Sequence, residues 1–437
     1  MLPERVTGQP RPPVLGIDFG TSNSAAALIG PDQQLRVMPL NGHSAAMPTA
    51  LFFSHETHTT LYGSEAMQAY LAGTEGRLMR AIKSLLGSKL MDEQTLVNGS
   101  ATPFFDIVVM FFKELKARSE AHVGYPITHA MLGRPVHFVD DSPERDALAQ
   151  DTLGRAAQAA GFTHINFQLE PIAAAFDFEQ RVTQETTALV VDIGGGTSDF
   201  TVIRLGPERC QRIERASDIL ATTGVHLGGT DFDRLLNLDC VMPLLGYKHI
   251  GPSGRQVPNS AFFDLATWHL IHHAYSRKSM HFARELWTSY IDQVLHRRLL
   301  EVLEGQHGHR LLAAVESAKI DCSVKHEGAQ VNLDFLHSQG NASTSTLAPE
   351  LFPEINPQRM GAALAQSLDQ VVQCALQCVQ DSGLAGVDVV YLTGGSSALQ
   401  PLMDALQAAL PNATLVQGDR FGGVAAGLAY AGSLARY

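Results

Sequence analysis

The chain has 437 residues, of which 45% are hydrophobic and 17% charged, and its formal net charge is −12. This composition is typical of globular proteins rather than disordered segments, and the length suffices for two or more cores of ordinary size. An acidic chain without clustered Lys and Arg is not expected to bind nucleic acid, and no apolar run approaches the ~20 residues of a membrane span. Five scattered cysteines, without a Cys-x-x-Cys pair, suit a reducing compartment, so we expect a cytoplasmic protein.

Three apolar strands that end in glycine turns are predicted along the chain. They cover residues 14–20 (VLGIDFG), 188–197 (ALVVDIGGGT) and 387–396 (VDVVYLTGGS). Each is rich in β-branched residues and is followed by a turn in which glycine permits close backbone approach. Two related turns that contain Asp, one in each half, predict a duplicated fold with one site between two lobes.

Helices are predicted in the intervening segments. Residues 145–161 have alanine-rich helical spacing that ends in glycine, and residues 358–382 form a long amphipathic stretch. Residues 265–303 are expected to form one or two helices. A helix of small residues is expected at 424–434, so the overall class is α/β.

Neither a P-loop nor a Gly-x-Gly-x-x-Gly fingerprint is present, so any phosphate must be held by the glycine turns. Their backbone N–H groups are donors, and acids beside them can orient Mg²⁺ through waters. The donors expected on the two sides of the phosphates are Gly20, Thr21 and Ser22, and Gly195, Gly196 and Thr197. The acids available to position the metal and an attacking water are Asp18, Asp192 and Asp199.

Four short motifs follow one another along the chain: GIDFGTSNS at 16–24, EPIAAA at 170–175, DIGGGTSD at 192–199 and LTGGS at 392–396. They resemble the first phosphate motif, the connecting helix, the second phosphate motif and the adenosine motif of DnaK-type heat-shock chaperones, which belong to the actin-like ATPase superfamily. Residues 81–87, 226–233 and 315–319 are similar to further family segments in the same order. The resemblance extends from about Val14 to Gly427 and is strongest to the short YegD-like members, which lack a peptide-binding domain.

The resemblance implies an actin-like fold of two duplicated, ribonuclease-H-like lobes with the nucleotide between them. Lobe I is expected at residues 1–187 plus 415–437. Lobe II is expected at 188–414, with a helical subdomain at about 231–322.

Site residues follow from the same resemblance. Asp18 and Asp199 are expected to orient Mg²⁺ through water, and Lys83 to contact the γ-phosphate. Glu170 and Asp192 would complete the shell of the attacking water, with Thr197 donating a hydroxyl. The residues implied in nucleotide contacts are Gly20, Thr21, Ser22, Asn23, Gly194, Gly195, Gly196, Thr197, Gly228, Gly229, Glu316, Lys319, Ile320, Ser323, Gly394, Gly395, Ser396 and Ala398. The implied cofactors are ATP or ADP and Mg²⁺, with K⁺ as a further candidate.

The adenine pocket is where the sequence departs from the family. DnaK-type chaperones sandwich adenine between two arginines, and the matching positions here are Ile320 and Ala398. Each lost cation–π contact is worth ~0.5–2 kcal/mol, so we expect looser ATP binding, relaxed base selectivity and nucleotide release without an exchange factor. The alternative is that a side chain from residues 265–303 stacks on the base.

The resemblance implies an ATP-hydrolysing conformational switch with a chaperone-like role, acting on an unidentified protein partner or client. Two alternatives stay open: a metabolite kinase of the same superfamily, and a non-enzymatic actin-like scaffold. Because the sequence stops at Tyr437, we expect that this chain alone does not hold unfolded polypeptide.

Overall fold

The computed structural model describes residues 12–139, 142–212, 214–336, 349–419 and 422–435. Its core is built on two mixed sheets, one of six strands and one of five. The first sheet has the order β11-β10-β1-β2-β3, with β4 added beside β2, and the second has the order β14-β13-β12-β17-β18. The strands of the first sheet are β1 (Val14–Phe19), β2 (Asn23–Ile29), β3 (Leu35–Val37), β4 (Met47–Pro48), β10 (His129–Arg134) and β11 (His164–Leu169). The strands of the second are β12 (Thr186–Ile193), β13 (Ser198–Leu205), β14 (Ile219–Val225), β17 (Val389–Thr393) and β18 (Thr414–Gln417).

The two sheets repeat one pattern of strand directions. In each, three consecutive strands form an antiparallel meander, and the first of these also pairs in parallel with a later strand, which in turn pairs in parallel with another. β12 therefore takes the place in the second sheet that β1 takes in the first. The predicted duplication is confirmed at the level of topology.

The central strands read as nearly continuous apolar runs because both faces of each sheet are covered. α2 (Phe104–Val123) and α3 (Pro143–Ala159) lie on the outer side of the first sheet, where Phe19 packs against Phe111 and Phe112. α11 (Pro357–Asp381) and α12 (Gln400–Ala409) cover the outer side of the second sheet. The helices predicted at 145–161 and 358–382 are thus confirmed.

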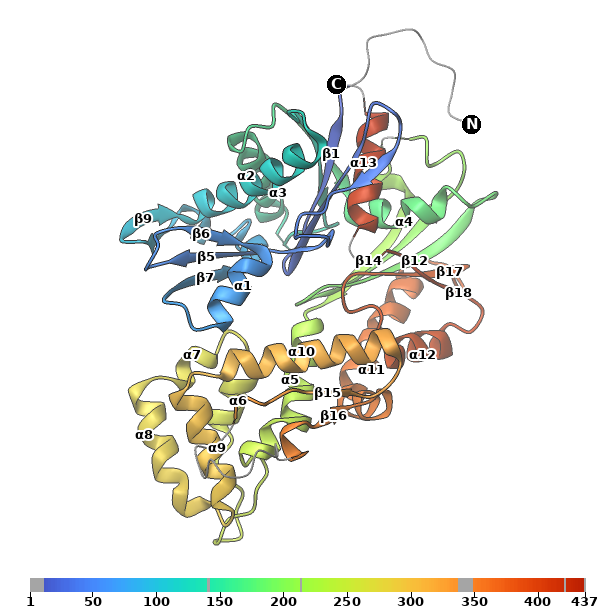
Figure 1. Cartoon of the computed structure of the whole chain (residues 1–437). Coiled ribbons are helices and arrows are strands. Elements are labelled where there is room, and N and C mark those ends of the chain that lie inside the picture. Colours follow the sequence, from blue (N-terminus) through green and yellow to red (C-terminus); the bar gives the residue numbers. More distant parts are fainter. Residues whose placement is uncertain (1–11, 140–141, 213, 337–348, 420–421, 436–437) are drawn as a thin grey trace.

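α4 (Glu170–Glu179) and α13 (Gly423–Leu434) lie between the two sheets (Figure 1). Each follows the last strand of its sheet, so the two helices are also equivalent in the duplicated plan. They approach closely: a Cβ on Gly427 would lie 2.0 Å from the Ala173 carbonyl oxygen, and the Phe176 and Tyr430 rings stack at 4.8 Å. The lobe boundary expected at 414/415 falls inside β18.

Two insertions extend the lobes. The first holds a small sheet, one helix, two short turns of 3₁₀ helix and a hairpin: β5 (Ala50–Ser54), β6 (Thr60–Tyr62), α1 (Gly63–Leu71), β7 (Gly76–Arg80), η1 (Ile82–Leu85), η2 (Lys89–Asp92), β8 (Gln94–Val97) and β9 (Ser100–Pro103). The second is mostly helical and forms the yellow-to-orange lower part of Figure 1: α5 (Gly229–Cys240), α6 (Ser260–Ala266), α7 (Ile271–Ala274), α8 (Arg277–Glu285), α9 (Gln293–Glu304) and α10 (Gly308–Lys325). A two-stranded sheet of β15 (Ala329–Gln330) and β16 (Glu354–Ile355) precedes α11.

The prediction of one or two helices at residues 265–303 is wrong. The segment is divided into α7, α8 and α9, with a 3₁₀ turn between the last two. Ser276 accepts a hydrogen bond from the Ser279 N–H, and Asp292 accepts one from the Val294 N–H, so each starts a new helix. These capping residues interrupt the apolar pattern, which alone suggests a longer helix.

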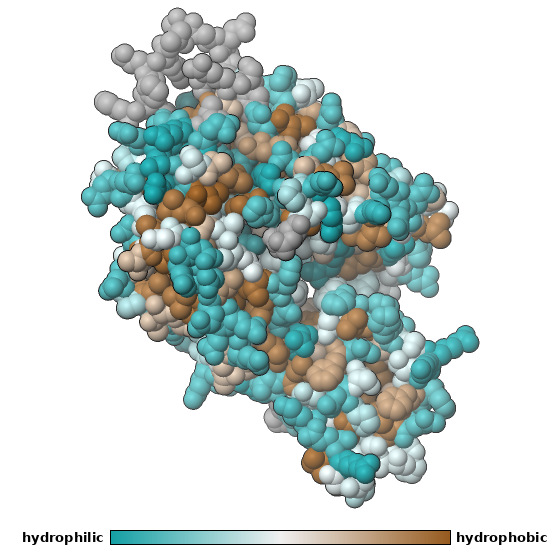
Figure 2. Space-filling view, turned by 180° about the vertical axis from the view of Figure 1, so that it is seen from behind, coloured by the Kyte–Doolittle hydropathy of each residue, from teal (hydrophilic) through white to brown (hydrophobic). Residues whose placement is uncertain are grey.

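The surface is hollowed between the upper sheets and the lower helical part when the molecule is seen from behind (Figure 2). Among the described residues, no helix is long and apolar enough to cross a membrane.

Candidate functional site

Two aspartates end the equivalent central strands of the two sheets. Asp18 lies near the end of β1 and Asp192 near the end of β12, and Asp192 faces Asp199 in the register of β12 and β13. The glycine turns come directly after these strands. The duplicated topology therefore brings the two Asp-Gly turns, 174 residues apart in the chain by the numbering of Asp18 and Asp192, to one place between the sheets.

The two turns touch. A Cβ on Gly195 would lie only 1.9 Å from the Ser22 hydroxyl oxygen, so a larger residue at 195 would force this side chain away. On the first-lobe side, Thr49 holds the turn: its hydroxyl donates to the Gly20 carbonyl at 2.8 Å, and its N–H donates to the Ser22 carbonyl at 2.8 Å. Sequence reasoning did not identify Thr49.

Lys83 and Glu170 form an ion pair beside the aspartates. Lys83 Nζ lies 2.8 Å from Glu170 Oε1, and the side chains are 13% and 12% exposed. Lys83 lies in η1, which follows a left-handed Ala81 at φ 52°, and Glu170 is the first residue of α4, with Pro171 in the first turn. Proline fits there because its missing N–H has no partner within the helix.

Burial, together with repulsion between neighbouring carboxylates, shifts the pKa values of the acidic groups in the site. Burial raises the pKa of Asp18 to about 7, assisted by the Glu170 charge and opposed by Lys83. Burial likewise raises the pKa of Asp192 to about 8, with Asp199 and Glu170 adding repulsion. Burial disfavours the Lys83 ammonium, but Glu170 and Asp18 outweigh it, and the pKa of Lys83 is raised. Crowded carboxylates of this kind are a donor set that suits a hydrated divalent cation.

Backbone hydrogen bonds from the start of α5 hold the second glycine turn in place. The Gly229 N–H donates to the Gly194 carbonyl at 3.0 Å, and the Thr230 N–H donates to the Gly195 carbonyl at 2.8 Å. A Cβ on Gly228 would meet the Gly196 nitrogen at 2.7 Å, which explains why glycine is needed there. Gly228 and Gly229 thus shape the turn through their backbone.

The third glycine turn joins the same group. Gly394 has φ 85°, a conformation that favours glycine, and a Cβ there would lie 2.4 Å from Asp192 Oδ1. The Ser396 N–H donates to the Ile193 carbonyl at 3.2 Å. A Cβ on Gly229 would lie only 2.4 Å from the Ser396 hydroxyl oxygen. Gly395 is exposed beside them.

α10 carries the residues expected around the nucleoside. Lys319 is buried and pairs with Asp233 at 2.7 Å, so in this structure its ammonium is directed to α5 rather than left open. Burial raises the pKa of Asp233 to about 6 against the opposing effect of Lys319. Ser323 is buried and donates to the Lys319 carbonyl at 2.7 Å. Asp233 lies in the segment 226–233, but sequence reasoning gave it no role.

The two substituted adenine positions differ in exposure. Ile320 is 50% exposed on α10 and follows the exposed Glu316 by one helical turn, whereas Ala398 is 4% exposed and lies in the core of the second lobe. Ala398 therefore presents no open face to a base. Thr21 is partly buried, Asn23 and Thr197 are exposed, and the Thr197 hydroxyl donates to Asp199 Oδ2 at 3.0 Å.

A second inter-lobe contact bridges the outer parts of the two insertions. The Tyr70 hydroxyl of α1 lies 3.0 Å from His309 Nδ1 at the start of α10, and the His309 ring packs edge-on against Trp268 at 4.6 Å. The guanidinium of Arg80, in β7, lies 4.2 Å from the centre of the Trp268 ring. No local sequence pattern could have revealed this cluster, because its members are up to 239 residues apart.

Parts of the chain are similar in sequence to known proteins. Residues 100–242 match the family model described as Hsp70 protein. The chain is 31% identical over 225 residues to the chaperone protein DnaK of Thermotoga maritima, covering 51% of this chain and 35% of that protein. It is 31% identical over 228 residues to DnaK of Endomicrobium trichonymphae, covering 51% and 34%.

The fold is of the actin-like ATPase class, as the sequence predicts. Within the chain, residues 100–242 resemble Hsp70 proteins, and about half of the chain is similar to DnaK-type chaperones. The match of residues 100–242 contains Glu170, Asp192 and Asp199 but neither Asp18 nor Lys83. The aligned part spans about a third of the length of these curated relatives, and the likeness to the short members stays a prediction.

Proposed function

We propose that this protein binds ATP with Mg²⁺ between its two sheets and hydrolyses the γ-phosphate. The observation that carries the proposal is the Lys83–Glu170 ion pair, which lies among Asp18 and Asp192 where the two glycine turns meet. A cation, carboxylates and glycine turns in one place are the components that phosphoryl transfer requires.

Each group has a part in this proposal. The N–H groups of the turns at Gly20–Ser22 and Gly195–Thr197 would hold phosphate oxygens, with the Thr21 and Thr197 hydroxyls beside them. Lys83 would neutralise charge on the γ-phosphate, while Glu170 and Asp192 would orient the attacking water. Asp18 and Asp199 would hold Mg²⁺ through water. The ion, when bound, would supply charge stabilisation across the β- and γ-phosphates.

Indirect coordination fits the structure. Among the described residues, no group of three or more His, Cys, Asp or Glu side chains could hold a metal directly. A cation at Asp18 and Asp199 would therefore take most of its ligands from water and phosphate, as Mg²⁺ commonly does.

The wider role we propose is that of a nucleotide-driven conformational switch with a chaperone-like function. Support comes from the relatives, which are chaperone proteins by name, and from side-chain contacts such as Tyr70–His309 that bridge the two lobes. The client or partner protein would be a separate molecule, and lobe closure around ATP would change the surface that it meets.

Calorimetric titration of ATP, with and without Mg²⁺, tests the proposal. Wild-type protein should bind one ATP in an Mg²⁺-dependent manner. Gly228→Ala should weaken binding, because its Cβ would press on the backbone of the second glycine turn at 2.7–2.8 Å. Gly386→Ala, whose Cβ would meet no atom within 4 Å, is the matched control and should bind like wild type. Absence of ATP binding to wild type, or equal binding by Gly228→Ala, would contradict the assignment.

A further inference from the structure

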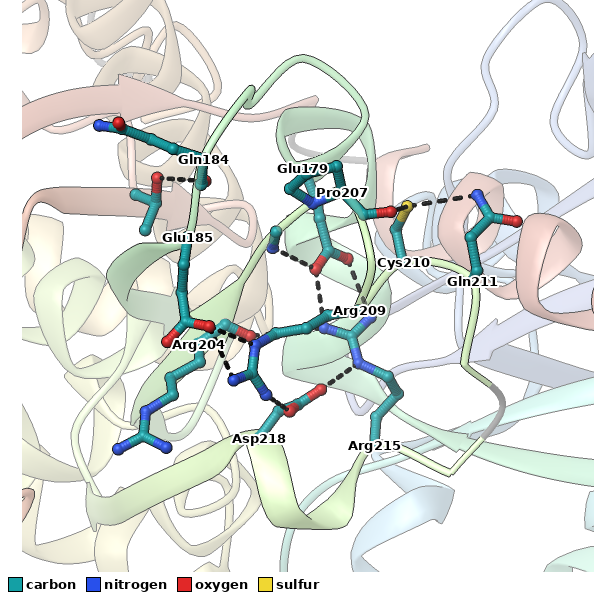
Figure 3. A network of polar contacts seen from close by, with 12 residues as sticks. Glu179, Gln184, Glu185, Arg204, Pro207, Arg209, Cys210, Gln211, Arg215 and Asp218 are labelled. Carbon is teal, nitrogen blue, oxygen red and sulfur yellow. Dashed lines mark hydrogen bonds and ion pairs between the residues drawn. The ribbon is translucent and has the colours of Figure 1, made fainter. Parts of the chain in front are cut away.

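A buried ion cluster lies at the end of α4 opposite to Glu170 (Figure 3). The Arg215 guanidinium donates to both oxygens of Glu179, at 2.9 and 2.8 Å, and also pairs with Asp218. Glu179, Arg215 and Asp218 have side chains that are at most 2% exposed. Asp218 pairs in turn with Arg209, whose other side bonds the exposed Glu185.

Glu179 stands at the end of the helix where a negative charge is least favourable. It is the last residue of α4, and the carbonyl end of a helix repels anions. A buried carboxylate in that place is stable only because its charge is neutralised and its oxygens are bonded. Besides Arg215, the Gly206 N–H donates to Glu179 Oε1 at 3.0 Å. The Glu179 carboxylate therefore destabilises α4 itself, and its bonds to Arg215 and Gly206 offset that cost.

These partners belong to the second lobe. Gly206 follows β13 directly, and Arg215 and Asp218 lie in the connection from β13 to β14. The cluster thus fastens the C-terminal end of α4 to the second sheet. At its N-terminal end the same helix presents Glu170 to Lys83, which belongs to the first-lobe insertion.

α4 has the stiffness to connect these two ends. Its ten residues form a rod of about 15 Å, and Ile172–Phe176 is a buried stretch along it. One face is in backbone contact with α13. Ile172, Ala173 and Phe176 also border a cavity of ≈ 260 Å³. Its other lining side chains come from β10, β11, α13 and the connection after β13. α4 is packed along its length against α13 and against strands of both sheets, so it moves as one unit and a displacement of one end is carried to the other.

We infer that Glu179 and Arg215 are positioning residues, which hold α4 to the second lobe and thereby set where Glu170 meets Lys83. The expected effect on catalysis rests on the proposed ATP hydrolysis. The coupling of the Glu179–Arg215 and Lys83–Glu170 ion pairs through α4 does not depend on it. Movement of the second lobe would then be carried directly to Glu170.

A double-mutant cycle on stability tests this coupling without nucleotide. Arg215→Met and Lys83→Met are made singly and together, and the free energy of unfolding is measured. Sites separated by the length of α4 normally contribute additively. The inference predicts that Lys83→Met costs less in the Arg215→Met protein, because the Lys83–Glu170 pair is already displaced. Glu185→Gln, which removes the exposed member of the cluster, is the control and should show no coupling to Lys83→Met.

If Arg215→Met does not fold, the paired variant Glu179→Met/Arg215→Met replaces it. That change removes both buried charges together and leaves Asp218 with Arg209. Additive effects in whichever cycle folds would overturn the inference.

Kinetics then show whether the coupling serves the reaction. The single-turnover rate of Arg215→Met at saturating ATP should fall about tenfold to a hundredfold, with the Kd for ATP within about twofold of wild type. Arg215→Lys should recover part of the rate. In a Glu170→Gln background the Arg215→Met change should cause no further loss, whereas a general structural defect would lower the rate again. Absence of hydrolysis by wild type would disprove the proposed function, while the stability cycle would still decide the positioning role.

Discussion

Lys83 Nζ and Glu170 Oε1 lie 2.8 Å apart, although 87 residues separate them in the chain. One side chain comes from an insertion in the first lobe and the other from the first turn of the helix between the sheets. Their pairing places a cation next to Asp18 and Asp192, whose pKa values are raised because burial and the neighbouring carboxylates outweigh the effect of Lys83.

Lys83→Ala should lower kcat by about 10²–10³-fold, because a single donor to developing negative charge is lost. The affinity for ATP should change little, since the glycine turns still hold the phosphates. Lys89→Ala, at an exposed position six residues on, is the control and should retain wild-type turnover. Measurement of kcat and of the Kd for ATP on the same preparations separates the two effects. If binding collapses while the rate per bound ATP stays constant, the role assigned to Lys83 is wrong.

The adenine side of the site should bind loosely. Ile320 is half exposed and can cover a base only by apolar contact, while the buried Ala398 offers no face at all. The alternative of a stacking residue from 265–303 is weakened for Trp268, because Arg80 and His309 already occupy its ring. Ile320→Arg should therefore tighten ATP binding about two- to thirtyfold.

The same experiment compares bases. Calorimetry with ATP and GTP on wild type should give Kd values within about tenfold of each other, since contacts to ribose and phosphate do not distinguish the bases. Nanomolar binding with strong preference for adenine would disprove this account of the pocket.

The Tyr70–His309 contact should weaken in acid. Burial lowers the pKa of His309 to about 4, with the Trp268 carbonyl opposing and the Arg80 and His272 charges adding to the shift. In the unfolded chain His309 binds a proton below pH ~6.5, whereas in the folded protein it does not do so until about pH 4. The free energy of unfolding that neutral His309 contributes is therefore complete above pH ~6.5 and is lost as the pH falls towards 4.

Between pH 7.5 and pH 4, protonation of His309 should lower the free energy of unfolding by about 3 kcal/mol. It is measured as the change with pH in the difference between the unfolding free energies of wild type and His309→Gln. The same comparison with exposed His43→Gln should show no such change. Parallel pH profiles for wild type and His309→Gln would show that His309 is not buried as a neutral side chain.

Local patterns predict the parts of this fold whose causes are local. The strands that end at Phe19, Ile193 and Thr393 are recognisable as apolar runs before glycine turns, and α3 and α11 as helical periodicities. In contrast, the region 265–303 is divided because Ser276 and Asp292 each cap the start of a new helix. The spacing of hydrophobic residues does not reveal such caps.

Contacts between segments that lie far apart in the chain could not be predicted from local sequence. Lys83 and Glu170 were identified through resemblance to the DnaK-type proteins, because neither residue has a distinctive neighbourhood. The pairs Tyr70–His309 and Glu179–Arg215 have no such motif, and they join segments that only the tertiary fold brings together. The roles assigned to the nucleotide-binding residues stay predictions until ligand is bound.

The central claim is that Mg²⁺-ATP is hydrolysed between Asp18 of the first lobe and Asp199 of the second. Its most direct test is single-turnover hydrolysis of ATP by purified wild type and Asp199→Asn, with and without Mg²⁺. Asp199 is exposed and bonded to Thr197, so the amide keeps the shape of the side chain and the fold should persist. We predict Mg²⁺-dependent formation of ADP by wild type and none above background by folded Asp199→Asn. Hydrolysis by Asp199→Asn at the wild-type rate, or no ADP formed by wild type with ATP bound, would contradict the account.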